Sequence, residues 1–313
     1  MPGAYAHITA VNVAREDLSE VLVQARLIIP ENFEFVQLGA LGPDFPYLDI
    51  YHRANAKWAD AMHYERIADR ILSGIGVVAG LRDEEKGRAL AWLLGFTAHV
   101  VTDVTIHPVV KLKVGDYRGH ETEHRICEMH QDVYIFTEKS GLDFHQAEFL
   151  KTMVDLCADP GHSTNVHPTV AYLWDQMFQR TDGALYVENE PHIDAWYYWF
   201  RALVGGVGDD RFLGLARHVL PWLDGVAYPL PEDVDRKEFI DSLDVPPPAS
   251  APLSHPRMHY DDIFSKAVDN IRRAWAIVAS DALTGTSLAG SFLRDWDLDT
   301  GVDKSNNAIT FWS

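Results

Sequence analysis

The sequence feature that most limits this fold is a long apolar segment, residues 89–106, which lies in an expected helix at residues 84–106 and is interrupted by one stripe of polar side chains. Apolar residues would lie on nearly all sides of a helix here, which predicts a helix buried all round. Residues four apart advance by about 40° around a helix, so His99, Asp103 and His107 fall on one stripe. Burying two imidazoles and a carboxylate is costly unless a partner such as a divalent cation compensates them. Pro108 is expected to end this helix.

The next expected helix, residues 121–137, repeats this spacing. His120, His124, Glu128 and Asp132 follow one another at steps of four and form a second polar stripe. The same spacing also arises from ion pairs on a solvated helix face, so this stripe alone is ambiguous. Two antiparallel helices with facing stripes would form a metal site inside a bundle. Imidazole and carboxylate ligands without thiolates suit zinc and related divalent ions.

Helical patterns also dominate the rest of the chain. Sustained alternation of apolar and polar residues is scarce, so no sheet is expected, and the Gly/Pro-rich residues 39–46 predict a turn between helices. We therefore predict an all-α fold, a multi-helix bundle. Its further helices are expected at residues 16–29, 54–75, 144–156, 166–178, 193–204, 211–223 and 260–283.

The predicted organisation is a single domain, residues 1–313. A chain this long buries enough surface to fold without disulfides, and its two cysteines do not form a CxxC pair. Any metal site must therefore be built from His and carboxylates. Within the domain we distinguish a motif-bearing metal core (about 1–135), a helical extension (about 140–244), a proline-rich connector (245–257) and a C-terminal helix (about 260–283).

Net charge and the start of the chain narrow the class of protein. A formal net charge of −19 argues against coating of nucleic acid, because that binding depends on Lys and Arg neutralising phosphates. No basic stretch followed by an apolar one opens the chain, so we expect no signal peptide and a cytoplasmic location. Since His99 and Asp103 interrupt residues 84–106, we expect a core helix rather than a transmembrane span. The oligomeric state is not predicted.

Several motifs, taken in order, resemble a known family. They are Ala6-His7-Ile8, the turn at residues 39–44, Met62-His63-Tyr64, and His99, Asp103 and His107 followed by His124, Glu128 and Asp132. This ordered set resembles the bacterial zinc-dependent phospholipases C, which are related to the fungal single-strand-specific zinc nucleases. The resemblance covers about the first 135 residues and implies an all-α bundle with a polynuclear zinc cleft.

The resemblance also implies ligands for two to three zinc ions. Asp44, His63 and His99 would hold one ion and share Asp103 with a neighbour. A second ion would be held by His107, His124 and Glu128. The third would be held by His7 and the amino-terminal group, supplied by Pro2 after removal of Met1, with Asp103 bridging. Asp132 would orient a ligand without binding the ion itself. His120, which lies near these motifs in the sequence, is a further candidate for such a supporting role.

The implied activity is hydrolysis of a phosphodiester by a zinc-bridged hydroxide that attacks phosphorus in line, with Asp44 as a candidate general base. The expected partner is a phosphate ester such as a phospholipid head group, and stable binding of nucleic acid is not expected. Three alternatives remain open: a single-strand nuclease, a phosphoesterase acting on a small molecule, and a non-catalytic zinc-binding helical protein.

Overall fold

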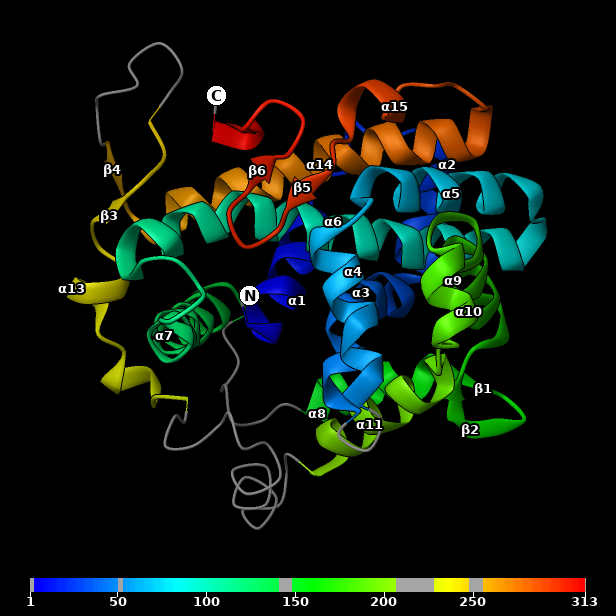
Figure 1. Cartoon of the computed structure of the whole chain (residues 1–313), viewed down its shortest axis with the longest axis horizontal. Coiled ribbons are helices and arrows are strands. Elements are labelled where there is room, and N and C mark those ends of the chain that lie inside the picture. Colours follow the sequence, from blue (N-terminus) through cyan, green and yellow to red (C-terminus); the bar gives the residue numbers. More distant parts are fainter. Residues whose placement is uncertain (1–2, 50–52, 141–147, 207–227, 248–255, 313) are drawn as a thin grey trace.

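A computed structural model describes residues 3–49, 53–140, 148–206, 228–247 and 256–312. Helices make up most of these residues and pack around one hydrophobic core (Figure 1). The prediction of an all-α fold is therefore confirmed. The expected helix at residues 211–223 lies outside the described residues.

Helix α6 (Asp83–Val114) is the central element and runs across the molecule between α3 (Phe33–Leu41) and α14 (Tyr260–Thr284) (Figure 1). It is long and apolar enough to cross a membrane by composition, but its most apolar stretch is wholly buried in the protein. It therefore serves as the core helix that its all-round apolar pattern predicts.

The contact between α3 and α6 is made at backbone distance. A Cβ atom on Gly95 would lie 2.0 Å from the carbonyl oxygen of Val36, and one on Gly39 would lie 2.1 Å from that of Trp92. Glycine at both positions therefore lets the two backbones touch. This close approach also brings the Ala40 carbonyl to the ring of His99, at 2.9 Å from Nδ1.

Helix α6 does not end at Pro108, so that prediction is wrong. The helix continues to Val114, and its residues remain buried as far as Val110. Proline has no N–H to donate to Val104, which usually kinks or breaks a helix. Here the packing around the buried residues holds the helix together despite the missing bond.

Other expected helices differ in their bounds. The helix expected at residues 54–75 is two helices, α4 (Ala56–Tyr64) and α5 (Ile67–Gly80), separated at Arg66, which has a left-handed backbone (φ 50°). The expected helix 16–29 is shorter and later in the chain, as α2 (Val23–Glu31), and contains Pro30. An unexpected helix, α1 (Ala4–Ala14), lies at the start of the chain and carries His7.

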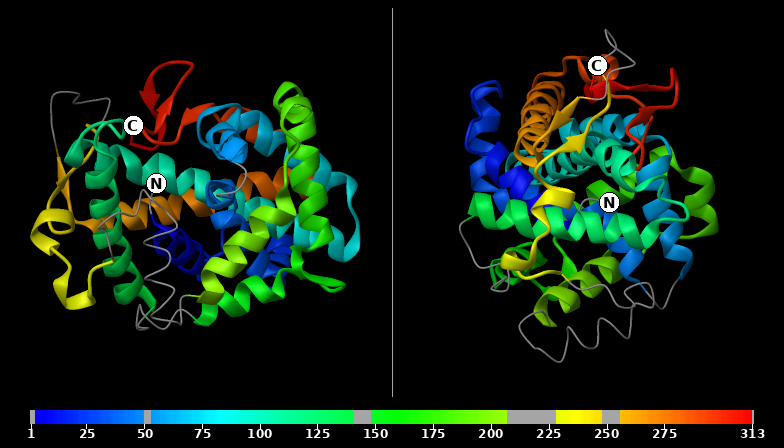
Figure 2. Two further views of the ribbon diagram at one scale, coloured as in Figure 1. Left: turned by 60° about the horizontal axis from the view of Figure 1, so that its bottom comes forward. Right: turned by 90° about the vertical axis from the view of Figure 1, so that its left-hand side faces the viewer.

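Helix α7 (Glu121–Ser140) crosses α6 steeply. Figure 1 shows α7 nearly end-on where α6 runs across the picture, and the right-hand view of Figure 2 shows α7 lengthwise. The expectation of two antiparallel helices is therefore wrong. A steep crossing lets α7 bring only part of its polar stripe to α6.

The remaining elements cover the core. After α7 come α8 (Glu148–Leu156), α9 (Pro168–Thr181), α10 (Gly183–Glu188), α11 (Ile193–Gly206), α13 (Arg236–Phe239) and α15 (Ala289–Phe292). Short 3-10 turns are η1 (Gly42–Leu48), η2 (Arg53–Asn55), η4 (Pro231–Asp233) and η5 (Thr310–Trp312). The expected turn at residues 39–46 is thus the end of α3 followed by η1.

Small antiparallel sheets are also present, contrary to the expectation of none. They pair β1 (Ala158–Asp159) with β2 (His162–Val166), β3 (Leu243–Asp244) with β4 (Arg257–Met258), and β5 (Trp296–Asp297) through β6 (Val302–Asp303) to β7 (Ala308–Ile309). Most of these strands have two residues, too few for an alternating pattern to show in the sequence. The sheet of β5–β7 belongs to the end of the chain, which lies beside α6 (Figure 1).

Candidate metal centre

Five elements deliver acidic and imidazole side chains to one interior region. The side chains are His7 from α1, Asp44 from η1, His63 from α4, His99, Asp103 and His107 from α6, and His124 and Glu128 from α7. All of them are buried except Asp44, whose side chain is 25% exposed. Asp44 therefore marks the side from which the centre is accessible to solvent.

His63 and His99 face each other through the same ring nitrogen, Nε2. Their Nε2 atoms lie 3.3 Å apart. His63 Nδ1 lies 2.7 Å from the Ala59 carbonyl, and His99 Nδ1 lies 2.9 Å from the Ala40 carbonyl. A carbonyl only accepts, so each ring carries a proton on Nδ1 and its Nε2 faces the other ring. Two Nε2 lone pairs at this distance would repel each other unless a proton or a metal cation lay between them.

Asp44 completes this first group. Its Oδ1 lies 3.3 Å from His63 Nε2, and one ligand atom each from Asp44, His63 and His99 lie within 4.8 Å of one another. Ligands about 2.0–2.1 Å from a tetrahedral zinc ion are separated by about 3.3–3.4 Å. The observed separations of 3.3 Å between these ligand atoms therefore match the spacing that zinc requires.

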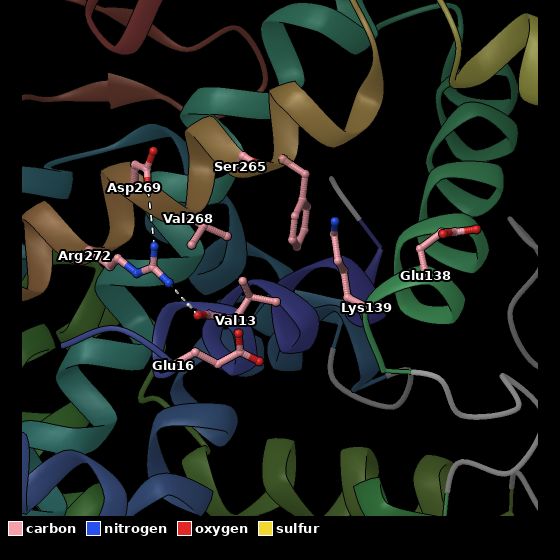
Figure 3. Close-up of a pocket in the computed structure, with 9 residues that line it drawn as sticks. Val13, Glu16, Glu138, Lys139, Ser265, Val268, Asp269 and Arg272 are labelled. Atoms are coloured by element: carbon pink, nitrogen blue, oxygen red, sulfur yellow. Dashed lines mark hydrogen bonds and ion pairs between the residues drawn. The ribbon is translucent and has the colours of Figure 1, made fainter.

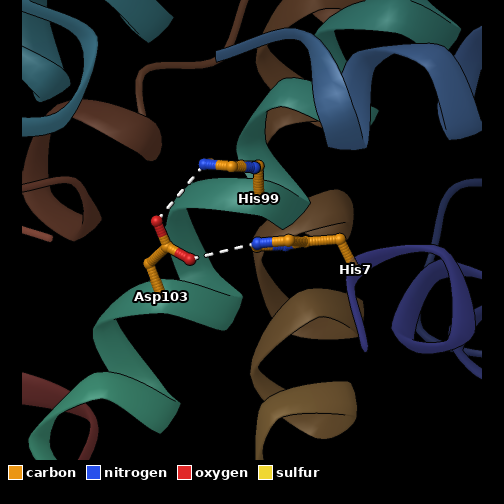
Figure 4. Close-up of side chains that lie close together, drawn as sticks. All are labelled: His7, His99 and Asp103. Carbon is orange, nitrogen blue, oxygen red and sulfur yellow. Dashed lines mark ion pairs between the residues drawn. The ribbon is translucent and has the colours of Figure 1, made fainter. Parts of the chain in front are cut away.

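Asp103 lies between the first group and a second one. Its Oδ1 is 3.3 Å from His7 Nε2, and its Oδ2 is 3.2 Å from His99 Nε2 and 4.0 Å from His63 Nε2 (Figure 4). The rings of His7 and His99 stack at 4.1 Å. Because the two carboxylate oxygens face different histidines, Asp103 has the geometry of a ligand that bridges two cations.

A third group meets at Glu128. Its Oε1 lies 3.8 Å from His107 Nε2 and 4.0 Å from His124 Nδ1. The opposite ring nitrogens lie on carbonyls, His107 Nδ1 at 2.5 Å from Leu298 and His124 Nε2 at 2.8 Å from Gly115. Each ring therefore turns its lone pair toward Glu128, as metal-binding histidines do. The separations are wider than in the first group.

Burial and neighbouring charges set the protonation of the centre. Burial lowers the pKa of His7 and His107, which leaves both rings in the neutral form that binds metal. Burial also disfavours charge on His99, but Asp103 and Asp44 outweigh it and raise its pKa to about 9. Burial raises the pKa of Glu128 to about 7. The carboxylate of Asp103 is buried too, yet His99 and His107 hold its pKa well below its usual range.

The donor atoms fit a divalent cation. Several buried atoms have no hydrogen-bond partner among the residues that the structure describes: both ring nitrogens of His7, Oδ1 of Asp44, both carboxylate oxygens of Asp103 and Nε2 of His107. Buried polar atoms are almost always hydrogen-bonded, so a cluster of unpartnered donors at one point calls for a cation. Nitrogen and oxygen donors without sulfur suit zinc.

Asp132 and His120, the two residues predicted to support the ligands, lie in different surroundings. Asp132 is buried and accepts from the backbone N–H of Ala6 at 2.8 Å, at the start of α1. It therefore holds the helix that carries His7. His120 is exposed, with Nδ1 3.0 Å from the Asp116 carbonyl, and its expected supporting role stays a prediction. Pro2, the expected terminal ligand, lies outside the described residues.

The sequence did not reveal the backbone groups that orient the rings. The carbonyls of Ala40, Ala59, Gly115 and Leu298 each face a ring nitrogen. A carbonyl belongs to every residue, so no residue type marks its position. The packing glycine Gly39, next to Ala40, is the one local signal that hinted at a close approach.

A comparison with protein families identifies the family of this chain. The model of the zinc-dependent phospholipase C family matches residues 6–183, more than half of the chain. The chain belongs to this family. A search of curated proteins and a search of solved structures gave no match. Membership makes the protein one of the zinc-dependent hydrolases, and the matched range contains all of the clustered side chains.

A separate pocket of about 350 Å³ lies between the ends of α1 and α7 and the side of α14 (Figure 3). The guanidinium of Arg272 donates to the carbonyls of Val13 and Ala14, the last residues of α1. Lys139 pairs with Asp261 at 3.6 Å. These cationic groups are engaged in holding helices together, so the pocket carries no comparable chemistry.

Proposed function

We propose that the protein is a phosphodiester hydrolase that uses two to three zinc ions held by the buried cluster. The observation that carries this proposal is the placement of Asp103, which faces His7 with one oxygen and His99 with the other at 3.2–3.3 Å. One ion would bind Asp44, His63, His99 and Asp103; another His7 and Asp103; and a further one His107, His124 and Glu128.

When bound, zinc would make water a nucleophile near neutral pH and stabilise negative charge on phosphoryl oxygens. The chain itself supplies the orientation. Carbonyls hold the protons of His63, His99 and His107 at Nδ1, so each Nε2 is available as a ligand. Among the described residues, the other side chains of the cluster are buried and Asp44 is the most exposed, so we take the Asp44 side as the one open to water.

Asp44 is the proposed general base. Its carboxylate is the most exposed of the cluster, and its pKa is lowered despite burial, because His99 and His63 stabilise its charge. It would accept a proton from the attacking water on the open side as the bond from phosphorus to the leaving oxygen breaks. Two or three divalent ions outweigh the charge of Asp44, Asp103 and Glu128, so a phosphate is favoured despite the acidic chain.

A phosphodiester with a small or lipid head group is the proposed substrate class. A single-strand nuclease would need a basic groove with exposed aromatic side chains. The aromatic residues 196–200 include Trp196, Tyr197 and Phe200, which are buried and serve core packing. This burial and the net charge of −19 favour the first reading over the nuclease. A cytoplasmic location stays a prediction.

The test combines metal analysis with turnover. Full-length protein would be assayed on chromogenic phosphodiesters, a phosphomonoester and single-stranded DNA, each with and without chelator. We expect turnover of a phosphodiester that chelation abolishes and zinc restores. Bound zinc without turnover of any substrate would favour the non-catalytic alternative. Cleavage of DNA alone would favour the nuclease.

A further inference from the structure

The end of the chain lies outside the region matched by the family, yet it reaches the metal centre. We call residues 295–304 the C-terminal strap; it contains β5, β6 and the turn between them. Leu298, in this turn, is fully buried. Its backbone N–H donates to the His63 carbonyl at 3.1 Å, and its carbonyl accepts from His107 Nδ1 at 2.5 Å. One strap residue thus touches two candidate ligands, on α4 and α6.

We propose that Leu298 is a positioning residue of the zinc centre, and that the strap completes a ligand set which the family region alone leaves unsupported. The Leu298 carbonyl holds the His107 proton at Nδ1 and aims Nε2 toward Glu128, which lies 3.8 Å away at Oε1. The N–H of the same residue bonds to the carbonyl of His63 and so fixes the last turn of α4, which carries the His63 ring. This inference rests on the proposed function, because it takes His107 and His63 as zinc ligands.

Gly301 allows the strap to lie this close to α6. Its φ is +66°, and a Cβ atom would lie 2.6 Å from the Val104 carbonyl and 2.5 Å from Cγ of Pro108. Pro108 has no N–H to donate to the Val104 carbonyl, and its ring lies beside that carbonyl against Gly301. A side chain at position 301 would therefore push the strap, and Leu298 with it, away from His107.

Further bonds tie the strap to the end of α4, which carries His63, and to the start of α5. Oδ1 of Asp295 accepts from the N–H of Ile67 at 3.0 Å, at the start of α5. The hydroxyl of Tyr64 donates to Oδ2 of Asp299 at 2.7 Å. Lys304 donates to the Tyr64 carbonyl. These bonds hold the strap against α4 and α5. The strap as a whole therefore keeps the two contacts of Leu298, with His63 and His107, in place.

The experiment compares two glycine variants of the full-length protein. Gly301→Ala displaces the strap, whereas Gly290→Ala adds the same methyl group in α15, where no atom of the described residues lies within 4 Å of it. Zinc affinity would be measured by competition with a chromogenic chelator, and the melting temperature of both metal-free variants would be recorded. The visible spectrum of the cobalt-substituted protein and ¹⁵N NMR of the His107 ring would report on ligand geometry and proton position.

We expect Gly301→Ala to weaken one zinc-binding step by about 10- to 100-fold, the range usual for groups that orient a ligand. Its cobalt spectrum should change, and His107 should lose its preference for the Nδ1 proton, while Gly290→Ala matches the parent. Equal zinc affinity and equal spectra for the parent and Gly301→Ala would overturn this inference alone. A parent that binds no zinc would overturn the proposed function as well.

A milder variant keeps the test decisive if Gly301→Ala does not fold. Tyr64→Phe removes only the hydroxyl that holds Asp299 and leaves the ring in place. We expect a several-fold weaker zinc affinity in the same step that depends on His107. Unchanged zinc affinity and an unchanged cobalt spectrum in a folded Tyr64→Phe would count against the strap.

Discussion

Helices α6 and α7 carry the same four-residue spacing of His and acidic side chains, but the molecule uses the two stripes differently. On α6, His99, Asp103 and His107 are all buried in the centre. On α7 the stripe begins at the surface with His120 and ends at Asp132, which holds α1 instead of facing the cluster. Spacing therefore identifies a helix face, and the angle between helices decides which members of that face can bind a metal.

The two stripes also differ in how tightly their atoms are arranged. The ligand-atom pairs His7–Asp103, His99–Asp103 and His63–His99 lie 3.2–3.3 Å apart, as tetrahedral zinc requires, and the pair His63–Asp103 is wider at 4.0 Å. The separations from Glu128 to His107 and His124 are 3.8–4.0 Å. We infer that α6 sets the geometry of the centre and that α7 contributes a looser site, so substitutions should have graded effects along the two stripes.

The largest effect is expected from the bridging residue of α6. Asp103→Asn keeps the shape of the side chain but removes the charge that both histidine groups share. Phosphodiester turnover should fall by more than about 100-fold, beyond the range of supporting residues, and more than one zinc ion per chain should be lost. Turnover assays and elemental analysis check this. Retention of all zinc would show that Asp103 does not bridge.

Glu128→Gln tests the looser site on α7. In the proposed arrangement one ion depends on Glu128, so the variant should lose about one zinc per chain while the ions around Asp103 remain. Turnover should fall less than in Asp103→Asn. Elemental analysis of the two variants side by side is the measurement, and an equal loss of zinc in both would remove the difference between the stripes.

Asp132→Ala tests whether the contact between Asp132 and the start of α1 supports the metal centre. The variant removes the acceptor that holds the N–H of Ala6 and should destabilise the protein by about 1–3 kcal/mol. Because α1 carries His7, zinc affinity should fall by about tenfold. Chemical denaturation and zinc competition measure the two effects. Asp132→Asn, which retains one acceptor oxygen, is the control and should lose less of both.

The smallest effect is expected at the exposed end of the α7 stripe. His120→Ala removes a side chain that lies outside the cluster and contacts the Asp116 carbonyl. Stability should change by less than about 0.5 kcal/mol, as is usual for surface substitutions, with zinc content and turnover unchanged. A loss of zinc here would mean that the whole stripe, and not its buried part, belongs to the centre.

Much of the site was accessible from the sequence because burial and spacing act together on α6. An apolar helix with one polar stripe must face compensating partners, which predicted His99, Asp103 and His107 as a unit. The steep crossing of α7 was not predictable, since spacing along one helix says nothing of the angle between two. The strap was missed for another reason: Leu298 acts through its backbone, and strands of two residues leave no periodic pattern.

The helices likewise divide into those that the sequence indicated and those whose bounds it did not. Helices with a strong apolar period, such as α11 and α14, were found close to their observed bounds. The break between α4 and α5 was missed because Arg66 adopts a left-handed backbone that its residue type does not indicate. Pro108 misled for the opposite reason: a local helix breaker is overridden where tertiary packing surrounds the helix on all sides.

Anomalous diffraction at the zinc absorption edge, on crystals of the full-length protein, tests the central claim most directly. The account predicts a peak between His63 Nε2 and His99 Nε2, about 2.0–2.1 Å from each nitrogen, and a second peak next to Oδ1 of Asp103. The same side-chain arrangement with no anomalous peak between the two imidazoles would contradict it, because a proton or hydrogen bonds would then hold these groups together.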